Sequence, residues 1–343
     1  MKKLILSLSW IISAILTLAQ APKLDWAKKF GGAYDDLGYS IAADASGNVY
    51  TTGSFRDSFD FDPGTTRFAM TSLGEADIFI SKLDASGKFV WAKKIGGIKT
   101  EAGYAIALDG NGNIYITGGF QGTVDFDPGT GVKSLTAGGT TMDIFVAKFD
   151  PSGNLSWAKS IGGVTNTTDY GSSIAADASG NVYTTGFFYA TVDFDPDAPV
   201  VNLSSSGNSD VFILKLDATG KFAWAKNIGS SSADAARSIS VDGAGNVYTT
   251  GSFTGTADFD PGSTESKLTS AGGTDIFISK LDASGKFVWA KNMGGSSDEE
   301  GTSIVVNASG ISYTIGRFAA TADFDPGTGT TNLTSLGDKD IFI

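Results

Sequence analysis

The sequence predicts an all-β protein in which one four-stranded unit recurs about every 65 residues. A Trp-Ala-Lys motif recurs at spacings of 65, 66, 67 and 65 residues, with its tryptophans at Trp26, Trp91, Trp157, Trp224 and Trp289. An Asp-Phe-Asp-Pro motif keeps the same phase and begins at Asp60, Asp125, Asp193, Asp258 and Asp323. The 45 glycines favour tight turns over long helices. Because the copies stay in phase, one repeat architecture is a better expectation than separate domains.

Each unit contains four segments rich in β-branched and aromatic residues, which is typical of strands. In the first unit these are residues 38–44, 48–55, 77–84 and 88–95. Short glycine-bearing loops join the first segment to the second and the third to the fourth, which predicts two hairpins. A longer loop with the Asp-Phe-Asp-Pro motif, called the DFDP loop below, joins the two hairpins.

Four antiparallel strands repeated radially are the design of a β-propeller blade. The first segment, rich in Ala and Ser, suits the innermost strand, and the repeated Trp suits packing between blades. The sequence therefore predicts a β-propeller of five four-stranded blades. We expect them at about residues 38–97, 103–163, 171–229, 236–295 and 301–343, the last completed by residues 24–32.

The two ends carry incomplete copies of the repeat. Residues 24–32 repeat an outermost strand, and Asp340–Ile343 repeats the start of a third strand. Pairing of these ends would complete a fifth blade and close the ring without an exposed sheet edge. The alternative is a fragment of a longer array, since Asp340–Ile343 stops where the other copies continue.

Residues 1–21 have two lysines, a short apolar run and the small residues Ala19 and Ala21, which together indicate a secretory signal peptide. An uncleaved anchor helix is the alternative, although the apolar run is short for a membrane span. We expect residues 22–343 to be a secreted or bacterial cell-surface propeller. After removal of the signal, no membrane insertion is expected.

Composition excludes several kinds of chemistry. Cysteine and histidine are both absent, so disulfides, thiolate nucleophiles, Ser-His-Asp triads and imidazole metal sites cannot form. A net charge of −12 argues against nucleic-acid partners. Any metal must be held by oxygen ligands, and no cofactor is required.

The DFDP loop is the best single motif for a bound ion. In extended backbone its two carboxylates point the same way, and with loop carbonyls they can hold Ca²⁺. The alternative is a turn in which the second Asp caps the Pro-Gly pair while the Phe anchors the loop. The candidate calcium ligands are Asp60, Asp62, Asp125, Asp127, Asp193, Asp195, Asp258, Asp260, Asp323 and Asp325.

The loops after the Gly-Gly pairs share a face with the DFDP loops and are the most varied part of the repeat. Variable loops on a rigid frame are where binding usually resides. The acidic candidates on this ligand face are Asp35, Asp36, Glu101, Asp169, Asp234, Asp298, Glu299 and Glu300. No repeat shows an unmatched cluster of Arg, Tyr and acidic residues, so no catalytic residue is predicted.

The sequence thus favours a non-catalytic binding or scaffold module for an extracellular glycan or protein. A carboxylate-dependent glycan-active enzyme is one alternative, because glycoside hydrolysis needs only paired carboxylates. A purely structural segment of a larger surface protein is the other.

Three stretches resemble the SBBP family of bacterial β-propeller repeats. They are residues 40–53 (SIAADASGNVYTTG), residues 77–84 (DIFISKLD) and the Ile-Gly-Gly of residues 95–97. The resemblance covers essentially all of residues 24–343. It implies a secreted or surface propeller, usually of seven blades and often followed by a C-terminal sorting domain for type IX export. It implies no enzymatic activity.

Overall fold

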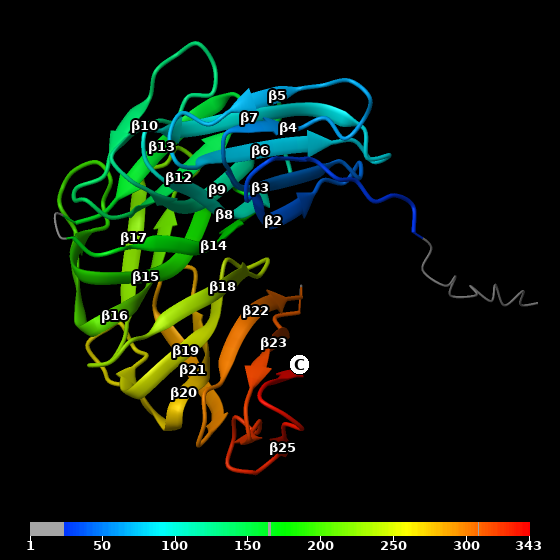
Figure 1. The fold of residues 1–343 in the computed structure, drawn as a ribbon. Helices are drawn as coiled ribbons and strands as arrows, with labels where there is room; N and C mark the ends of the chain where they lie inside the picture. Colours follow the sequence, from blue (N-terminus) through cyan, green and yellow to red (C-terminus); the bar gives the residue numbers. More distant parts are fainter. Residues whose placement is uncertain (1–23, 164–165, 308) are drawn as a thin grey trace, which may run out of the picture.

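The computed structural model describes residues 24–163, 166–307 and 309–343, so the expected signal peptide lies outside the described residues. All regular elements among these residues are β-strands, and no helix that could span a membrane occurs in this part of the chain. The strands form antiparallel sheets that follow one another around an open arc, with β2, β8, β14, β18 and β22 on its inner side (Figure 1).

Four sheets contain the strand order expected of propeller blades, with neighbours in chain order. Blade 1 holds β2 (Leu37–Ala43), β3 (Val49–Phe55), β6 (Asp77–Leu83) and β7 (Phe89–Gly97). Blade 2 holds β8 (Glu101–Leu108), β9 (Ile114–Phe120), β12 (Asp143–Phe149) and β13 (Leu155–Ile161). Blade 3 holds β14 (Tyr170–Ala176), β15 (Val182–Asp193), β16 (Asn202–Leu216) and β17 (Phe222–Ile228). Blade 4 holds β18 (Ala235–Val241), β19 (Val247–Asp258), β20 (Lys267–Leu281) and β21 (Phe287–Gly295).

The fifth sheet has three strands, β22 (Glu300–Val306), β23 (Ser312–Phe318) and β26 (Asp340–Phe342). The structure does not confirm the expected pairing of the N-terminal segment with this sheet. Among the described residues, β26 pairs with β23 alone, and residues 24–30 form no strand. The reason is that the N-terminal segment lies against blade 1, far around the arc from β26 (Figure 1).

The DFDP segment was expected to be a loop and is instead a second hairpin in every blade. In blades 3 and 4 it is the continuation of the long strands β15–β16 and β19–β20. Elsewhere it forms separate short strands. These are β4 (Ser58–Asp60) with β5 (Ala69–Thr71), β10 (Thr123–Asp125) with β11 (Ser134–Thr136), and β24 (Thr321–Asp323) with β25 (Asn332–Thr334).

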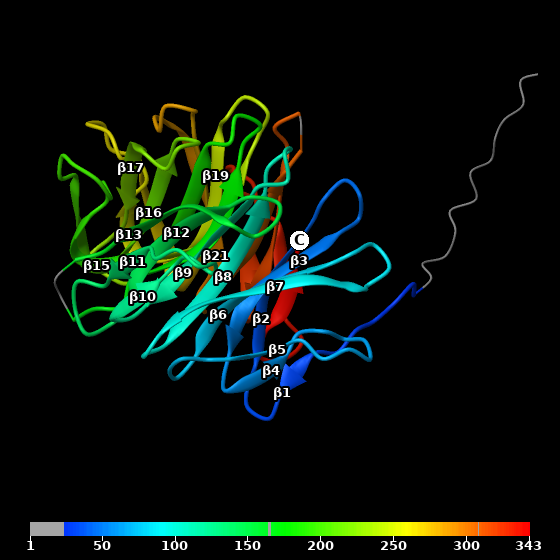
Figure 2. The ribbon, with the colours of Figure 1, turned by 90° about the horizontal axis from the view of Figure 1, so that it is seen from above.

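Each DFDP hairpin also pairs with the Gly-Gly end of the strand before its own blade. Asp125 pairs with Gly96, Asp323 with Gly294, and Asp60 with Gly31 of β1 (Gly31–Gly32). The hairpins β4–β5 and β10–β11 lie along one side of the arc, at the lower edge of Figure 2. They join neighbouring blades and form the face that carries the Gly-Gly loops.

The short turns inside each blade are built by a capping aspartate. Asp44 Oδ1 accepts hydrogen bonds from the backbone N–H of Ser46 at 2.9 Å and of Asn48 at 3.0 Å. Gly47 has a φ of 79°, a conformation that favours glycine. This arrangement is an Asx turn and recurs in the other hairpins, which explains the repeated Asp-x-x-Gly sequence.

Neighbouring blades are held together by repeated contacts, so the expected role of the tryptophans is confirmed. Trp157 Nε1 donates to the carbonyl oxygen of Ala218 in the next blade at 3.2 Å, and Trp224 makes the same bond to Ala283 at 3.3 Å. On the inner strands, Ser173 accepts a hydrogen bond from Ile239 N of the next blade at 3.2 Å. Buried Ile, Phe and Tyr side chains fill the space between.

Candidate functional site

The first carboxylate of each DFDP motif organises its own hairpin. Asp125 Oδ1 accepts from the backbone N–H of Asp127 at 3.0 Å and of Lys133 at 2.8 Å. The same two bonds recur at i+2 and i+8 in the other copies, at Asp60, Asp193, Asp258 and Asp323. The motif's phenylalanine is buried against the blade, as at Phe126, whose ring lies 5.4 Å from that of Phe120.

The second carboxylate caps the turn that follows. Asp62 Oδ1 accepts from Gly64 N at 2.8 Å, and the corresponding backbone N–H bonds are accepted by Asp127, Asp195, Asp260 and Asp325. These bonds match the capped-turn alternative for the motif. Among the described residues, no group of three or more acidic side chains is placed to hold a metal ion. Calcium binding at these ten residues stays a prediction.

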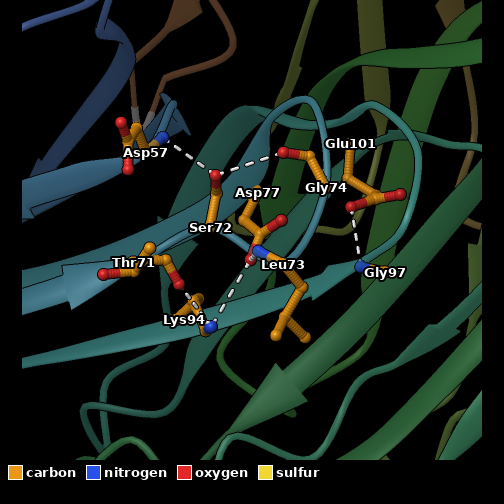
Figure 3. Close-up of polar contacts among 9 residues, drawn as sticks. All are labelled: Asp57, Thr71, Ser72, Leu73, Gly74, Asp77, Lys94, Gly97 and Glu101. Atoms are coloured by element: carbon orange, nitrogen blue, oxygen red, sulfur yellow. Dashed lines mark hydrogen bonds and ion pairs between the residues drawn. The ribbon is translucent and has the colours of Figure 1, made fainter.

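Most of the acidic side chains expected on the ligand face turn inward. Glu101 is fully buried, and its Oε2 accepts from Gly97 N at 2.9 Å (Figure 3). In later blades Glu299 and Asp234 accept the corresponding hydrogen bond from the backbone N–H four residues before them. Asp36 accepts it from Gly32 N at the N-terminal segment. Asp169 accepts instead from Tyr189 N at 2.8 Å. These five carboxylates therefore shape the loops rather than present a charged surface.

A second set of buried carboxylates lies beside them, at the start of each third strand. Asp77 Oδ2 accepts from Leu73 N at 3.0 Å and lies 3.7 Å from Lys94 Nζ, while its Oδ1 has no hydrogen-bond partner (Figure 3). Asp143, Asp210 and Asp275 are buried in the same place. Sequence reasoning missed this role, although an Asp begins every copy of this strand.

Burial raises the pKa values of eight of these carboxylates, which are Glu101, Asp169, Asp234, Glu299, Asp77, Asp143, Asp210 and Asp275. For Glu101, burial is the largest cause and the charge of Asp77 adds to it, so that the pKa rises to about 7. Burial also raises the pKa of Asp169 to about 7 and that of Asp143 to about 6. Perturbed pKa values often mark functional sites. Here the geometry points to structural groups, since each carboxylate accepts backbone hydrogen bonds.

Three residues expected on the ligand face remain. Asp35 is exposed, and Asp298 is exposed with its Oδ1 accepting from Thr274 N at 3.1 Å. Glu300 is different, because it leaves the loop and points to the inner side of the arc. There it forms ion pairs with Arg237 at 2.6 Å and Arg317 at 2.5 Å.

An aromatic row continues from these ion pairs along the inner strands. Tyr39, Tyr104 and Tyr170 come from blades 1, 2 and 3, and the successive ring centroids are 5.0 Å apart. Tyr170 also contacts Phe187, with centroids 4.4 Å apart. These rings meet edge-on or tilted, and tyrosine offers both an apolar ring face and a hydroxyl group.

These features meet at a cavity of about 450 Å³ on the inner side of the arc. Because its lining strands begin after the Gly-Gly loops, it lies toward the face of the DFDP hairpins. We call its principal side chains the central cluster: Tyr104, Tyr170, Arg237, Glu300 and Arg317. Both arginines keep part of their side chains exposed, so they can contact a ligand.

Comparison of single repeats, which showed no unmatched cluster of Arg, Tyr and acidic residues, could not reveal the central cluster. The cluster was missed because its members lie in different repeats and come together only around the arc. A signal was present at the residue before the small inner-strand residue, which is Ser in four copies and Ala105 in the second. The residue at this position is Tyr39, Tyr104, Ser172, Arg237 and Thr302 in successive copies. A position that varies within a nearly constant strand faces something other than the neighbouring blade.

Comparison with known proteins identifies the repeat. The β-propeller repeat family SBBP matches residues 25–54, 90–118, 157–186 and 223–259. The chain is an SBBP β-propeller repeat protein. Each of the four matched SBBP segments includes part or all of an inner-strand hairpin, and the last also reaches the DFDP hairpin.

Curated relatives of this SBBP protein are much longer than it is. The uncharacterized WD repeat-containing protein L264 of Acanthamoeba polyphaga mimivirus is 27% identical over 248 residues, covering 64% of this chain and 18% of that protein. The regulatory protein FlaEY of Caulobacter vibrioides is 28% identical over 140 residues, covering 41% of this chain and 14% of that protein. The SBBP chain thus spans less than a fifth of either relative.

Solved structures similar to the SBBP chain have low sequence identity. The Pan2 WD40 domain of Neurospora crassa is 8% identical, with a TM-score of 0.39 over 84% of this chain and 75% of that one. A protein of unknown function from Bacteroides caccae is 11% identical, with a TM-score of 0.29 over 75% of this chain and 82% of that one.

Proposed function

We propose that this SBBP propeller is a non-catalytic binding module whose ligand occupies the central cluster. The observation that carries the proposal is that Tyr104, Tyr170, Arg237 and Arg317 line one cavity although the repeat does not require them there. Propeller repeat families generally serve as binding scaffolds. Side chains that depart from the repeat and meet in a cavity are the ones available for a specific ligand.

The chemistry of the cluster favours an acidic glycan. A tyrosine ring offers a flat face that can cover the C–H face of a sugar. An arginine guanidinium forms paired hydrogen bonds with a carboxylate. Two arginines share the single acid Glu300, so the cavity has a local excess of positive charge on a chain of net charge −12. This excess favours an anionic ligand over a neutral one.

Titration with oligogalacturonate, an acidic sugar polymer, and with a neutral galactose oligomer tests the proposal. We expect oligogalacturonate to bind more tightly, and Arg317→Gln to weaken it about tenfold or more, as loss of a charged hydrogen bond does. Arg67→Gln is the matched control, because Arg67 lies on the DFDP hairpin of blade 1. Equal affinity for both sugars, or equal losses in both variants, would contradict an acidic-glycan site.

Thermal unfolding of the protein with calcium and with a chelator tests calcium binding at the DFDP hairpins. A bound calcium ion would raise the melting temperature of the protein, since a ligand that binds the folded state stabilises it. A melting temperature that is the same with calcium and with chelator would contradict a calcium site.

A carboxylate-dependent glycan-active enzyme receives less support from the central cluster. Glycoside hydrolysis uses two carboxyl groups with different protonation states. The cluster contains one acid, Glu300. Burial acts to raise its pKa, but the two arginines together outweigh burial, so that the pKa is lowered. That group is thus held in the charged form and is unsuited to donate a proton near neutral pH.

The proposal places the module outside the cell or on its surface, on the strength of residues 1–21. Expression of the whole chain in a bacterium with fractionation should yield an exported protein whose N-terminus begins near Pro22. Protein sequencing of that N-terminus checks the expectation. An N-terminus at Met1 in the cytoplasmic fraction would contradict it.

A further inference from the structure

The aromatic row of the inner strands continues into blade 3, past the cavity of the central cluster. Tyr170, which lines that cavity, lies next to Phe187 on β15, with ring centroids 4.4 Å apart. Phe187 in turn lies next to Tyr189, with ring centroids 5.9 Å apart. All three residues are partly exposed. We call Tyr170, Phe187 and Tyr189 the blade 3 arm, because they form a continuous aromatic path that leaves the central cluster.

The repeat does not require aromatic residues in the blade 3 arm. In the other blades the residues equivalent to Phe187 are Ser54, Gly119, Ser252 and Arg317. Tyr189 likewise stands where the other copies have Arg, Gln, Thr or Ala. Phe188, which lies between them, is different, because a phenylalanine occurs at its position in all five copies and is buried in each. Since side chains alternate along a strand, the framework uses one face of β15 and the arm lies on the other.

The surrounding structure makes room for the blade 3 arm and fixes its backbone. Gly119 of blade 2 lies beside Tyr170, and a Cβ added to this glycine would be 3.3 Å from Tyr170 Cβ. Tyr189 N donates to the buried Asp169 at 2.8 Å. Thr254 N makes the same bond to Asp234 in blade 4 at 2.9 Å. Because this bond belongs to the framework and uses only the backbone of Tyr189, the tyrosine side chain is available to contact a ligand.

The blade 3 arm leads from the inner side of the arc toward the face of the DFDP hairpins. β15 pairs with the innermost strand β14 and continues past Tyr189 into the DFDP hairpin of its blade (Figure 1). Tyr170 is the first residue of β14 and pairs with Phe187. A chain held at the central cluster can therefore extend over the arm toward this face.

We propose, on the basis of the proposed function of the central cluster, that its ligand is a chain of several sugars. An acidic sugar contacts the two arginines, and the sugars that follow it lie on Tyr170, Phe187 and Tyr189. Phe187 has no hydroxyl group, so the arm contributes mainly apolar area, and the free energy gained grows with the area removed from water. A single acidic sugar held at the arginines leaves most of the arm uncovered.

Titration with galacturonate, a single acidic sugar, and with oligogalacturonate tests this path. Phe187→Ser introduces the residue present at Ser54 and Ser252, so the blade should tolerate it. This variant should weaken the binding of oligogalacturonate about fivefold or more, the effect of one lost aromatic contact, and leave the affinity for galacturonate unchanged. Arg317→Gln should weaken both ligands. The loss in Phe187→Ser reports on the arm better than the wild-type preference does, since a longer chain also offers more ways to bind.

Tyr189→Thr, which introduces the residue present at Thr254, should show the same selective loss. Tyr34→Ser is the matched control, because Tyr34 is 61% exposed in a loop outside the arm and its loss should change neither affinity. A variant that binds galacturonate as the wild type does has kept the central cluster folded.

The outcomes separate the path along the arm from the proposed function itself. If Phe187→Ser and Tyr189→Thr bind oligogalacturonate as tightly as the wild type, or weaken both ligands equally, the path is wrong. Selective weakening by Tyr34→Ser as well would also overturn it. In each of these cases the effect of Arg317→Gln still tests the central cluster. If the wild-type chain binds neither ligand, the proposed function and the path are both wrong.

Discussion

Replacement of Gly118 by alanine should destabilise the folded chain by about 3 kcal/mol or more. Gly118 lies on β9, where an added Cβ would be 1.9 Å from the backbone carbonyl oxygen of Ala102 on β8 and 3.0 Å from the ring of Phe145. The carbonyl belongs to the paired inner strands, and Phe145 is fully buried. Neither can move away without separating the β8–β9 pair or the core beneath it.

Urea denaturation of Gly118→Ala and of Gly110→Ala measures this effect. Gly110 lies in the turn between the same two strands, and nothing lies within 4 Å of a Cβ added there. Its substitution should change the free energy of unfolding by less than about 0.5 kcal/mol. If Gly118→Ala does not fold while Gly110→Ala does, the expected large loss of stability is also confirmed. A Gly118→Ala chain with wild-type stability would contradict the close approach of β8 and β9.

The regular part of the fold was predictable because each blade repeats the same local chemistry. Asp44, Gly47 and their equivalents build the turns with bonds between near neighbours, which a sequence pattern reports directly. Trp157 packs on the next blade in the way its regular spacing suggested. Closure of the ring was not predictable in this way, because it depends on the angle between blades.

The candidate site was harder to predict because acidity along the chain does not reveal where a carboxylate points. Glu101 and Asp234 looked like surface charges on variable loops, yet their oxygens accept backbone hydrogen bonds inside the loop. Arg237 and Arg317 lie 80 residues apart in the sequence and meet only through Glu300. The DFDP motif stood out by repetition, and repetition is more typical of framework than of a specific site.

The buried carboxylates of both sets predict that the propeller loses stability as the pH rises from 5 to 8. The pKa of Glu101 is about 7 in the folded chain against an ordinary value of 4.5, and that of Asp210 is about 6 against 3.8. Burial is the largest cause at both residues. Between the ordinary and the raised pKa, the folded state binds more protons than the unfolded state. Stability is therefore full below the ordinary pKa and falls as the pH rises through the raised one.

Glu101→Gln isolates one part of this dependence, because glutamine resembles the protonated acid and keeps an oxygen for the N–H of Gly97. Since one pKa unit is worth about 1.4 kcal/mol, the variant should lose on the order of 3 kcal/mol less than wild type between pH 5 and pH 8. Denaturant midpoints across this range provide the measurement. Glu265→Gln, at an exposed acid on the surface, should keep the wild-type slope. A wild-type chain that becomes more stable as pH rises would show that Glu101 and Asp77 share a bound cation or lie closer to solvent than their burial indicates.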